Sequence, residues 1–272
     1  MTPLRLAYLL DETSISGSAR IALAQADALI DRGHQVRLVT KGLPLTWRNS
    51  RAEWVYVDDF REYDATGDFV VPAEVLTRFP IVDEEFFRSR LPRECDPPRV
   101  LLCGASQDEV NGVDDGYGAA AHARWFHQKL ELIRASPWAP SREEPLEAVQ
   151  EFHVGLTTIE MTRLAHACDI LIAPNRSEER FGLTAAEALA SALACVFTAI
   201  PSFLAFDEAH DYALFAPENN AVELGERLIE LLGDARLRHR LRTRGREVAE
   251  QWRAEKVVPR LEAHLYEQRD EA

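Results

Sequence analysis

The sequence predicts an α/β protein of two domains, in which parallel sheets are flanked by helices. Short apolar runs such as residues 170–172, bounded by Asp169 and Pro174, are typical of interior strands of a parallel sheet. Segments rich in alanine and leucine separate these runs, which predicts helices between the strands. The chain has 272 residues, 46% of them hydrophobic, so it is long enough for two modest cores.

The first predicted domain, residues 1–90, is the shorter one. Its expected elements are strands at residues 4–10, 35–40, 54–57 and 68–71, a helix at residues 19–30, and the start of an irregular linker at residues 72–98. Because ligands bind at the carboxyl ends of parallel strands, residues 11–18 with Gly17 form a candidate ligand loop. An ordinary turn is the equally weighted alternative for this single glycine.

The second predicted domain covers residues 91–252, and a final helix covers residues 253–272. Its expected elements are strands at residues 99–104, 130–134, 170–172 and 194–198 and helices at residues 117–126, 222–232 and 237–252. The final helix has an apolar face, which we expect to cover the first sheet. That face consists of Val257, Val258, Leu261 and Leu265.

One acidic turn, residues 174–182, connects a buried strand to a helix that begins near Gly182 or Leu183. The first N–H groups of a helix lack partners inside it, and together with the helix dipole they favour a bound anion. Glu179 and Glu187 lie on either side of Gly182, which lets the backbone approach a ligand closely. We therefore expect the chemistry of the protein at this acidic turn.

This pattern resembles the E-x7-E signature of glycosyltransferase family 4, the retaining, metal-independent enzymes of the GT-B architecture with two Rossmann-like domains. The similar order of elements spans about residues 99 to 267. The resemblance implies that Glu179 is catalytic and contacts the donor sugar, and that Glu187 accepts hydrogen bonds from the ribose. The other donor-binding positions implied are Phe181, Gly182, Leu183, Thr184, Gly155, Leu156, Ser106, Asn111 and Gly17.

The sequence departs from the family where the family has cations that clamp the diphosphate. Ala105, Ser106 and Asn111 occupy that loop here, and losing one such group would cost about 2.7–4 kcal/mol in the barrier. The candidate replacements are Arg176, Arg180, Arg20 and Lys41. The first domain also has about half the usual number of residues.

The function implied is that of a hexosyltransferase-like enzyme of polysaccharide biosynthesis. It would move a sugar from a UDP- or GDP-linked donor to a glycan or lipid-linked acceptor, without a metal or cofactor. The alternative is a catalytically weakened nucleotide-sugar-binding or partner-dependent protein. A sugar epimerase is a third reading, which the acidic turn disfavours. An exposed edge of the shortened sheet further predicts pairing into a homo-oligomer.

Composition excludes several other classes of protein. The net charge of −14 disfavours nucleic acid as a partner, and arginines at every second position from 236 to 246 predict a solvated helix. No apolar run is long enough to span a membrane and no signal peptide is evident, so we expect a cytoplasmic protein. The four widely spaced cysteines predict reduced thiols, and the order of acidic residues 108–115 does not fit a calcium loop.

Overall fold

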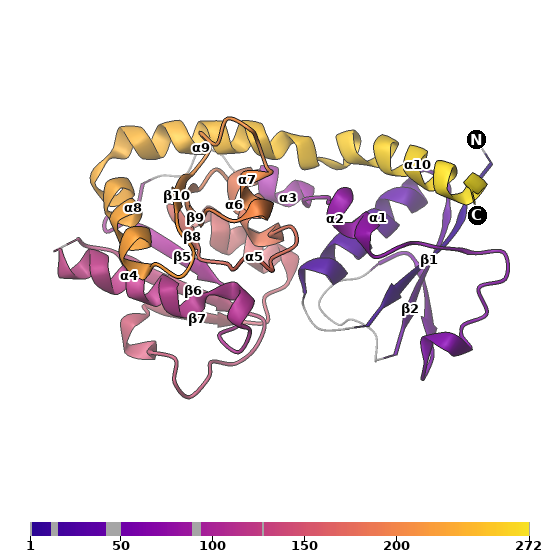
Figure 1. Ribbon diagram of the computed structural model, residues 1–272, viewed down its shortest axis with the longest axis horizontal. Coiled ribbons are helices and arrows are strands. Elements are labelled where there is room, and N and C mark those ends of the chain that lie inside the picture. Colours follow the sequence, from indigo (N-terminus) through magenta and orange to yellow (C-terminus); the bar gives the residue numbers. More distant parts are fainter. Residues whose placement is uncertain (1, 12–15, 42–49, 89–93, 127, 272) are drawn as a thin grey trace. The chain divides into compact units, whose positions relative to one another are not determined.

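The computed structural model describes residues 2–11, 16–41, 50–88, 94–126 and 128–271 (Figure 1). The chain forms two compact units, one of Met1–Asp83 with Gln251–Ala272 and one of Glu84–Glu250. The boundary predicted between residues 90 and 91 lies outside the described residues. Among those that are described, no helix combines the length and apolar character needed to cross a membrane.

The first unit is built on a four-stranded parallel sheet in the order β3-β2-β1-β4. Its elements are β1 (Arg5–Leu10), α1 (Gly17–Asp31), β2 (Gln35–Thr40), β3 (Glu53–Tyr56), η1 (Phe60–Glu62), β4 (Phe69–Val70), α2 (Glu74–Arg78) and α10 (Ala254–Glu271). Alternate residues of β1 and β2 face a core shared with α1 and α10, to which α10 contributes Val257, Val258, Leu261 and Leu265. Glu262 fixes α10 further, because it accepts hydrogen bonds from Arg32 (2.6 Å) and His34 (2.9 Å).

The segment that was predicted as an irregular linker is partly helical and buried, which corrects the sequence prediction. It contains α2 and, in the second unit, α3 (Glu84–Phe87), while residues 89–93 lie outside the described part. The buried amide of Gln25 donates to the carbonyl oxygens of Val75 (3.3 Å) and Phe79 (2.7 Å). These contacts hold the segment against the core, which the proline-bearing sequence alone did not indicate.

The second unit is built on a six-stranded parallel sheet in the order β10-β9-β8-β5-β6-β7. Its strands are β5 (Arg99–Cys103), β6 (Glu131–Ser136), β7 (Glu151–Val154), β8 (Ile170–Ala173), β9 (Ala194–Thr198) and β10 (Leu214–Ala216). Its longer helices are α4 (Val113–Trp125), α5 (Thr158–His166), α6 (Leu183–Ala190), α8 (Ala221–Gly233) and α9 (Ala235–Ala249); the shorter ones are η2 (Glu109–Asn111), η3 (Leu146–Ala148) and α7 (Pro201–Leu204).

Helices cover both faces of this sheet. Figure 1 shows α4 and α8 on one side and α5 and α6 on the other. Helix α4 begins at Val113, four residues before its predicted start, because Gly112 caps it and two aspartates stand in its first turn, where the dipole favours them.

The arginine-rich helix α9 is not solvated all round, which corrects another prediction. Arg238 and Arg242 are buried. Arg238 pairs with Glu94 (2.9 Å), and Arg242 pairs with the buried carboxylate of Asp169 (3.0 Å).

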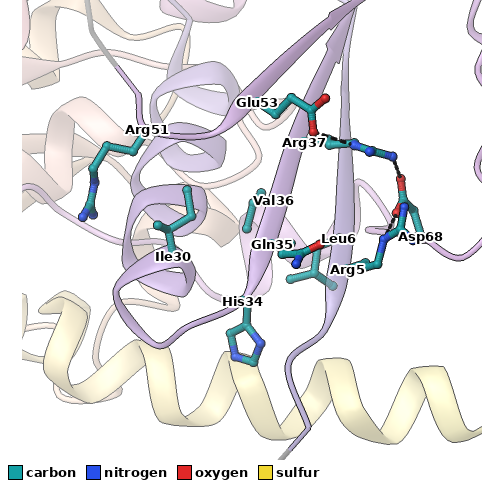
Figure 2. A pocket seen from close by; sticks show the side chains of 10 residues that line it. All are labelled: Arg5, Leu6, Ile30, His34, Gln35, Val36, Arg37, Arg51, Glu53 and Asp68. Atoms are coloured by element: carbon teal, nitrogen blue, oxygen red, sulfur yellow. Dashed lines mark hydrogen bonds and ion pairs between the residues drawn. The ribbon is translucent and has the colours of Figure 1, made fainter.

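A cluster of charged side chains at the amino end of the first sheet lines a pocket, which Figure 2 shows. The side chain of Asp68 is only 1% exposed and pairs with Arg5 (3.0 Å) and Arg37 (2.7 Å), and Tyr63 donates its hydroxyl to the same carboxylate. Burial alone would raise the pKa of Asp68, but the hydrogen bonds from Tyr63 and Arg37 and the charges of Arg37 and Arg5 outweigh it. The pKa of Asp68 is therefore lowered.

Asp68→Asn should destabilise the protein near neutral pH and have less effect in acid. A carboxylate whose pKa is lowered on folding stabilises the fold above its unfolded pKa, and this contribution is lost as the pH falls through the folded pKa. We expect urea unfolding at about pH 7 to show a loss of about 1.5–3 kcal/mol, which narrows towards about pH 3. The exposed Asp58→Asn is the control; an equal deficit at both pH values would contradict this account of Asp68.

Candidate functional site

The carboxyl ends of β5 and β8 mark the point where the connections of the second sheet diverge. These two strands are neighbours, but the chain leaves β5 through α4 towards β6 and leaves β8 through α6 towards β9. The two connections therefore run in opposite directions along the sheet. In open parallel sheets, this divergence creates the crevice in which ligands bind.

The loop after β5, residues 104–112, is held by its own polar side chains. Asn111 donates its side-chain amide to the carbonyl oxygen of Ala105 (3.2 Å). Asn111 also lies against Gly104, where an added methyl group would come within 2.7 Å of its side chain. Ser106 donates its hydroxyl to Glu144 (2.8 Å). Ser106 and Asn111, both predicted to bind the donor, thus shape this loop in the structure.

Glu144 belongs to a buried charge network that the sequence did not reveal. Its carboxylate pairs with Arg134 of β6 (2.8 Å), and the two side chains are 1% and 0% exposed. Tyr117 donates its hydroxyl to Glu144 (2.9 Å). The pKa of Tyr117 is raised mainly by its burial and also by this hydrogen bond. Arg134 also donates to the carbonyl oxygens of Leu102 and Gly104 at 3.1 and 2.8 Å. The network ties the ends of β5 and β6 together.

The acidic turn lies directly against the loop after β5. The N–H group of Arg176 donates to the carbonyl oxygen of Val110 (2.8 Å), and the side chain of Arg176 pairs with Asp115 (2.5 Å). Gly112 has a φ of +57°, and an added methyl group would lie 1.9 Å from the carbonyl oxygen of Pro174. Only glycine permits this approach of the two backbones.

Glu179 points back onto its own turn. One carboxylate oxygen accepts from the N–H groups of Gly182 (3.0 Å) and Phe181 (3.3 Å), and the other accepts from the side-chain amide of Asn175 (2.9 Å). A carboxylate has about four lone-pair sites, so three accepted bonds leave room for a ligand hydroxyl. Two of the amides predicted to hold the donor are therefore engaged by Glu179 itself.

The amides that remain open are those of the first turn of α6. Gly182 caps the helix with a φ of +77°, and no side chain caps it. The N–H groups of Leu183 and Thr184 have no acceptor among the residues that the structure describes. Glu187 lies one turn further along α6, with a side chain that is buried.

The sequence prediction missed the residues that bond to the acidic turn and hold it in place. Glu218, which follows β10, accepts from the N–H group (2.9 Å) and the hydroxyl (2.8 Å) of Ser177. The side-chain amide of Asn175 donates to Glu179 (2.9 Å), four residues further on. This short spacing was the one sequence feature that could have indicated the contact. Ala192, just after α6, adopts a φ of +58°, a left-handed backbone that favours glycine.

The remaining predicted positions lie apart from the acidic turn. Gly155, with Leu156, follows β7, and its N–H group donates to Ser136 (2.9 Å), so this loop lies at the same edge of the sheet but two strands from β5. Gly17 is the first residue of α1 in the other unit, and residues 12–15 of its loop lie outside the described residues. Lys41, also in that unit, pairs with Asp11 (3.2 Å).

The structure offers no obvious nucleophile or metal ligand set among the residues it describes. All four cysteines are thiols rather than disulfide partners, and burial raises the pKa of the Cys168 thiol to about 12, so it stays protonated. No three His, Cys, Asp or Glu side chains in the described ranges gather as a metal site would require. The groups that lie at the carboxyl ends of β5 and β8 are carboxylates, amides and arginine, all of which act by hydrogen bonding.

The fold is that of the GT-B glycosyltransferases. The chain superposes on a glycosyltransferase from Rickettsia africae ESF-5 with a TM-score of 0.68, at 13% identity, over 98% of this chain and 99% of that one. It superposes on WaaG, a glycosyltransferase involved in lipopolysaccharide biosynthesis, with a TM-score of 0.69, at 14% identity, over 94% and 98% of the two chains. Sucrose-phosphate synthase from Thermosynechococcus elongatus gives 0.68 at 14% identity over 97% and 98%.

A family match adds sequence evidence to this shared fold. Residues 139–248 match the model of the group 1 glycosyl transferases, so the second unit carries a group 1 glycosyltransferase domain. That range contains β8, the acidic turn and α6. No curated protein matches the chain.

Gly182→Ala should destabilise the second unit by at least about 2 kcal/mol. The left-handed backbone costs a residue with a side chain about 1–2 kcal/mol, and crowding in a packed interior adds about 1–3 kcal/mol. The crowding is expected because the new methyl group would lie 2.2 Å from the Phe203 ring. Denaturant unfolding measures the loss.

Gly233→Ala is the matched control for this substitution. Gly233 ends α8, and outside its chain neighbours and the backbone of its own helix no atom of the described residues lies within 4 Å of where its methyl group would be. We expect its unfolding free energy to change by less than about 1 kcal/mol. Equal stability of the two variants would show that the turn does not need glycine at position 182.

Proposed function

We propose that the protein is a retaining, metal-independent glycosyltransferase of family 4. It transfers a hexosyl group from a UDP- or GDP-linked donor to a glycan or lipid-linked acceptor. One observation carries the proposal. Within the group 1 domain, the carboxylate of Glu179 and the open amides of Leu183 and Thr184 stand together at the start of α6, where the sheet connections diverge.

The proposed roles follow from the chemistry of these groups. Backbone N–H groups at a helix start suit the anionic diphosphate, whereas carboxylates suit sugar hydroxyls. Glu179 has a lone pair left for a hydroxyl of the sugar, and Glu187 accepts from the ribose. The amides of Leu183 and Thr184 stabilise the negative charge of the departing diphosphate, as oxyanion donors do. The backbone of Gly155 and Leu156 lines the base.

The proposed reaction needs no side-chain nucleophile. The acceptor hydroxyl enters on the face that the diphosphate leaves, and the diphosphate takes up the proton of that hydroxyl. The first unit, residues 1–83 with the final helix, holds the acceptor. The second unit holds the nucleotide sugar.

A second function has specific support, namely nucleotide-sugar binding with weakened turnover. The loop after β5 carries Ala105 and Asn111 where family members have cations, and Asn111 is used to shape the loop. Ala192 adopts a left-handed backbone that glycine would relieve. Such departures accumulate where turnover is no longer required.

Incubation of the purified protein with UDP-, GDP- and ADP-sugars tests the proposal. We expect slow nucleotide release from at least one donor, and we expect Glu179→Gln to lower that rate by about 10²-fold or more. Glu178→Gln is the matched control, because this neighbouring glutamate is exposed. Its rate should equal that of the unsubstituted protein.

Three results separate the proposed functions. Release that depends on Glu179 supports the glycosyltransferase. Donor-dependent thermal stabilisation without release favours the weakened binder, and no response to any donor contradicts both.

Pairing of two copies of the chain is a separate proposal, which light scattering tests. A monomer at all workable concentrations would contradict it.

A further inference from the structure

The proposed diphosphate site lies at the carboxyl ends of β5 and β8, and the loop after β5 supplies no arginine or lysine to it. Between residues 99 and 126, the arginines are Arg99, at the amino end of β5, and Arg124, at the end of α4, where it donates to Ala148 (2.8 Å). Neither can serve the opposite edge. A diphosphate that leaves with its charge needs stabilisation, so another element must supply the cation.

Arg134 lies under the carboxyl ends of these strands but is fully enclosed. It pairs with Glu144 and donates to three carbonyl oxygens, those of Leu102, Ala135 and Gly104, and its side chain is 0% exposed. A guanidinium group that is fully enclosed and hydrogen-bonded shapes the loop rather than contacting a ligand.

Arg176 has the exposure that Arg134 lacks. Its backbone N–H group joins the acidic turn to Val110, and its Nη1 atom donates to Asp115 (2.5 Å). A methyl group added at Gly112, the cap of α4, would lie 3.2 Å from that Nη1 atom, so the guanidinium group adjoins the start of this helix. The side chain is 21% exposed, and its Nε and Nη2 groups have no acceptor among the described residues.

We propose that Arg176 is the cation that contacts the donor diphosphate, with Asp115 as the residue that positions it. This inference rests on the proposed function and identifies a replacement for the cations missing at Ala105 and Asn111. The ion pair fixes the guanidinium group before the ligand arrives, which lowers the entropic cost of binding. Arg180, in the same turn, is exposed and has no partner in the described part of the chain, so nothing holds it in place.

The pairing with Asp115 allows a sharp test. Arg176→Gln removes the donors and leaves the Asp115 carboxylate facing the ligand, so a loss of affinity alone could reflect repulsion. Arg176→Gln combined with Asp115→Asn removes both charges. If Arg176 contacts the diphosphate, the double variant stays weak; if Arg176 only neutralises Asp115, the double variant recovers the original affinity.

The experiment is calorimetric titration of the full chain with UDP, GDP and ADP and with UMP, GMP and AMP at constant ionic strength. We expect Arg176→Gln and the double variant to bind the preferred diphosphate about 10- to 100-fold more weakly. Affinity for the matching monophosphate should change by less than about threefold. Arg176→Lys should retain most of the affinity, because it keeps the charge. Thermal unfolding of each variant checks that the fold is intact.

Arg180→Gln is the matched control and should change the affinity by less than about threefold. Recovery in the double variant, unchanged diphosphate affinity in Arg176→Gln, or a loss confined to Arg180→Gln would each overturn the assignment of Arg176 while leaving the proposed function standing. Failure of the unsubstituted protein to bind any nucleotide would overturn both.

Discussion

The candidate site depends on one close approach of two backbones, that of Pro174 to Gly112. A side chain at position 112 would collide with the carbonyl oxygen of Pro174, and the same approach allows the N–H group of Arg176 to reach Val110 at 2.8 Å. The contact brings the loop after β5 and the acidic turn after β8 together where the sheet connections diverge. Every proposed donor contact near Glu179 assumes this arrangement.

Around that contact, three carboxylates bind other groups of the protein. Glu144 neutralises Arg134, Glu218 holds Ser177, and Glu179 caps the amides at the end of its own turn. An acidic protein with a net charge of −14 would repel an anionic donor if these groups were free. Their pairing leaves arginine and helix amides as the groups that a diphosphate can meet.

The local part of this arrangement could be predicted from the sequence. The strand before Pro174, the glycine at position 182 and the helix that follows depend on neighbours in the chain, and the structure has β8 and α6 there. The fold class, parallel sheets flanked by helices in a GT-B arrangement, is likewise confirmed. The roles of Glu179, Glu187 and the other donor-binding positions stay predictions.

The rest depends on distant partners that no local pattern reveals. Arg238 and Arg242 were predicted to be solvated, yet their burial is set by Glu94 and Asp169, 144 and 73 residues away. The pairing of Arg134 with Glu144 and of Arg176 with Asp115 similarly requires the sheet to be assembled first. The most direct test of the central claim is hydrogen–deuterium exchange with and without saturating UDP or GDP. The account predicts slower exchange at residues 104–112 and 174–187; unchanged exchange there, with slowing elsewhere or nowhere, would contradict it.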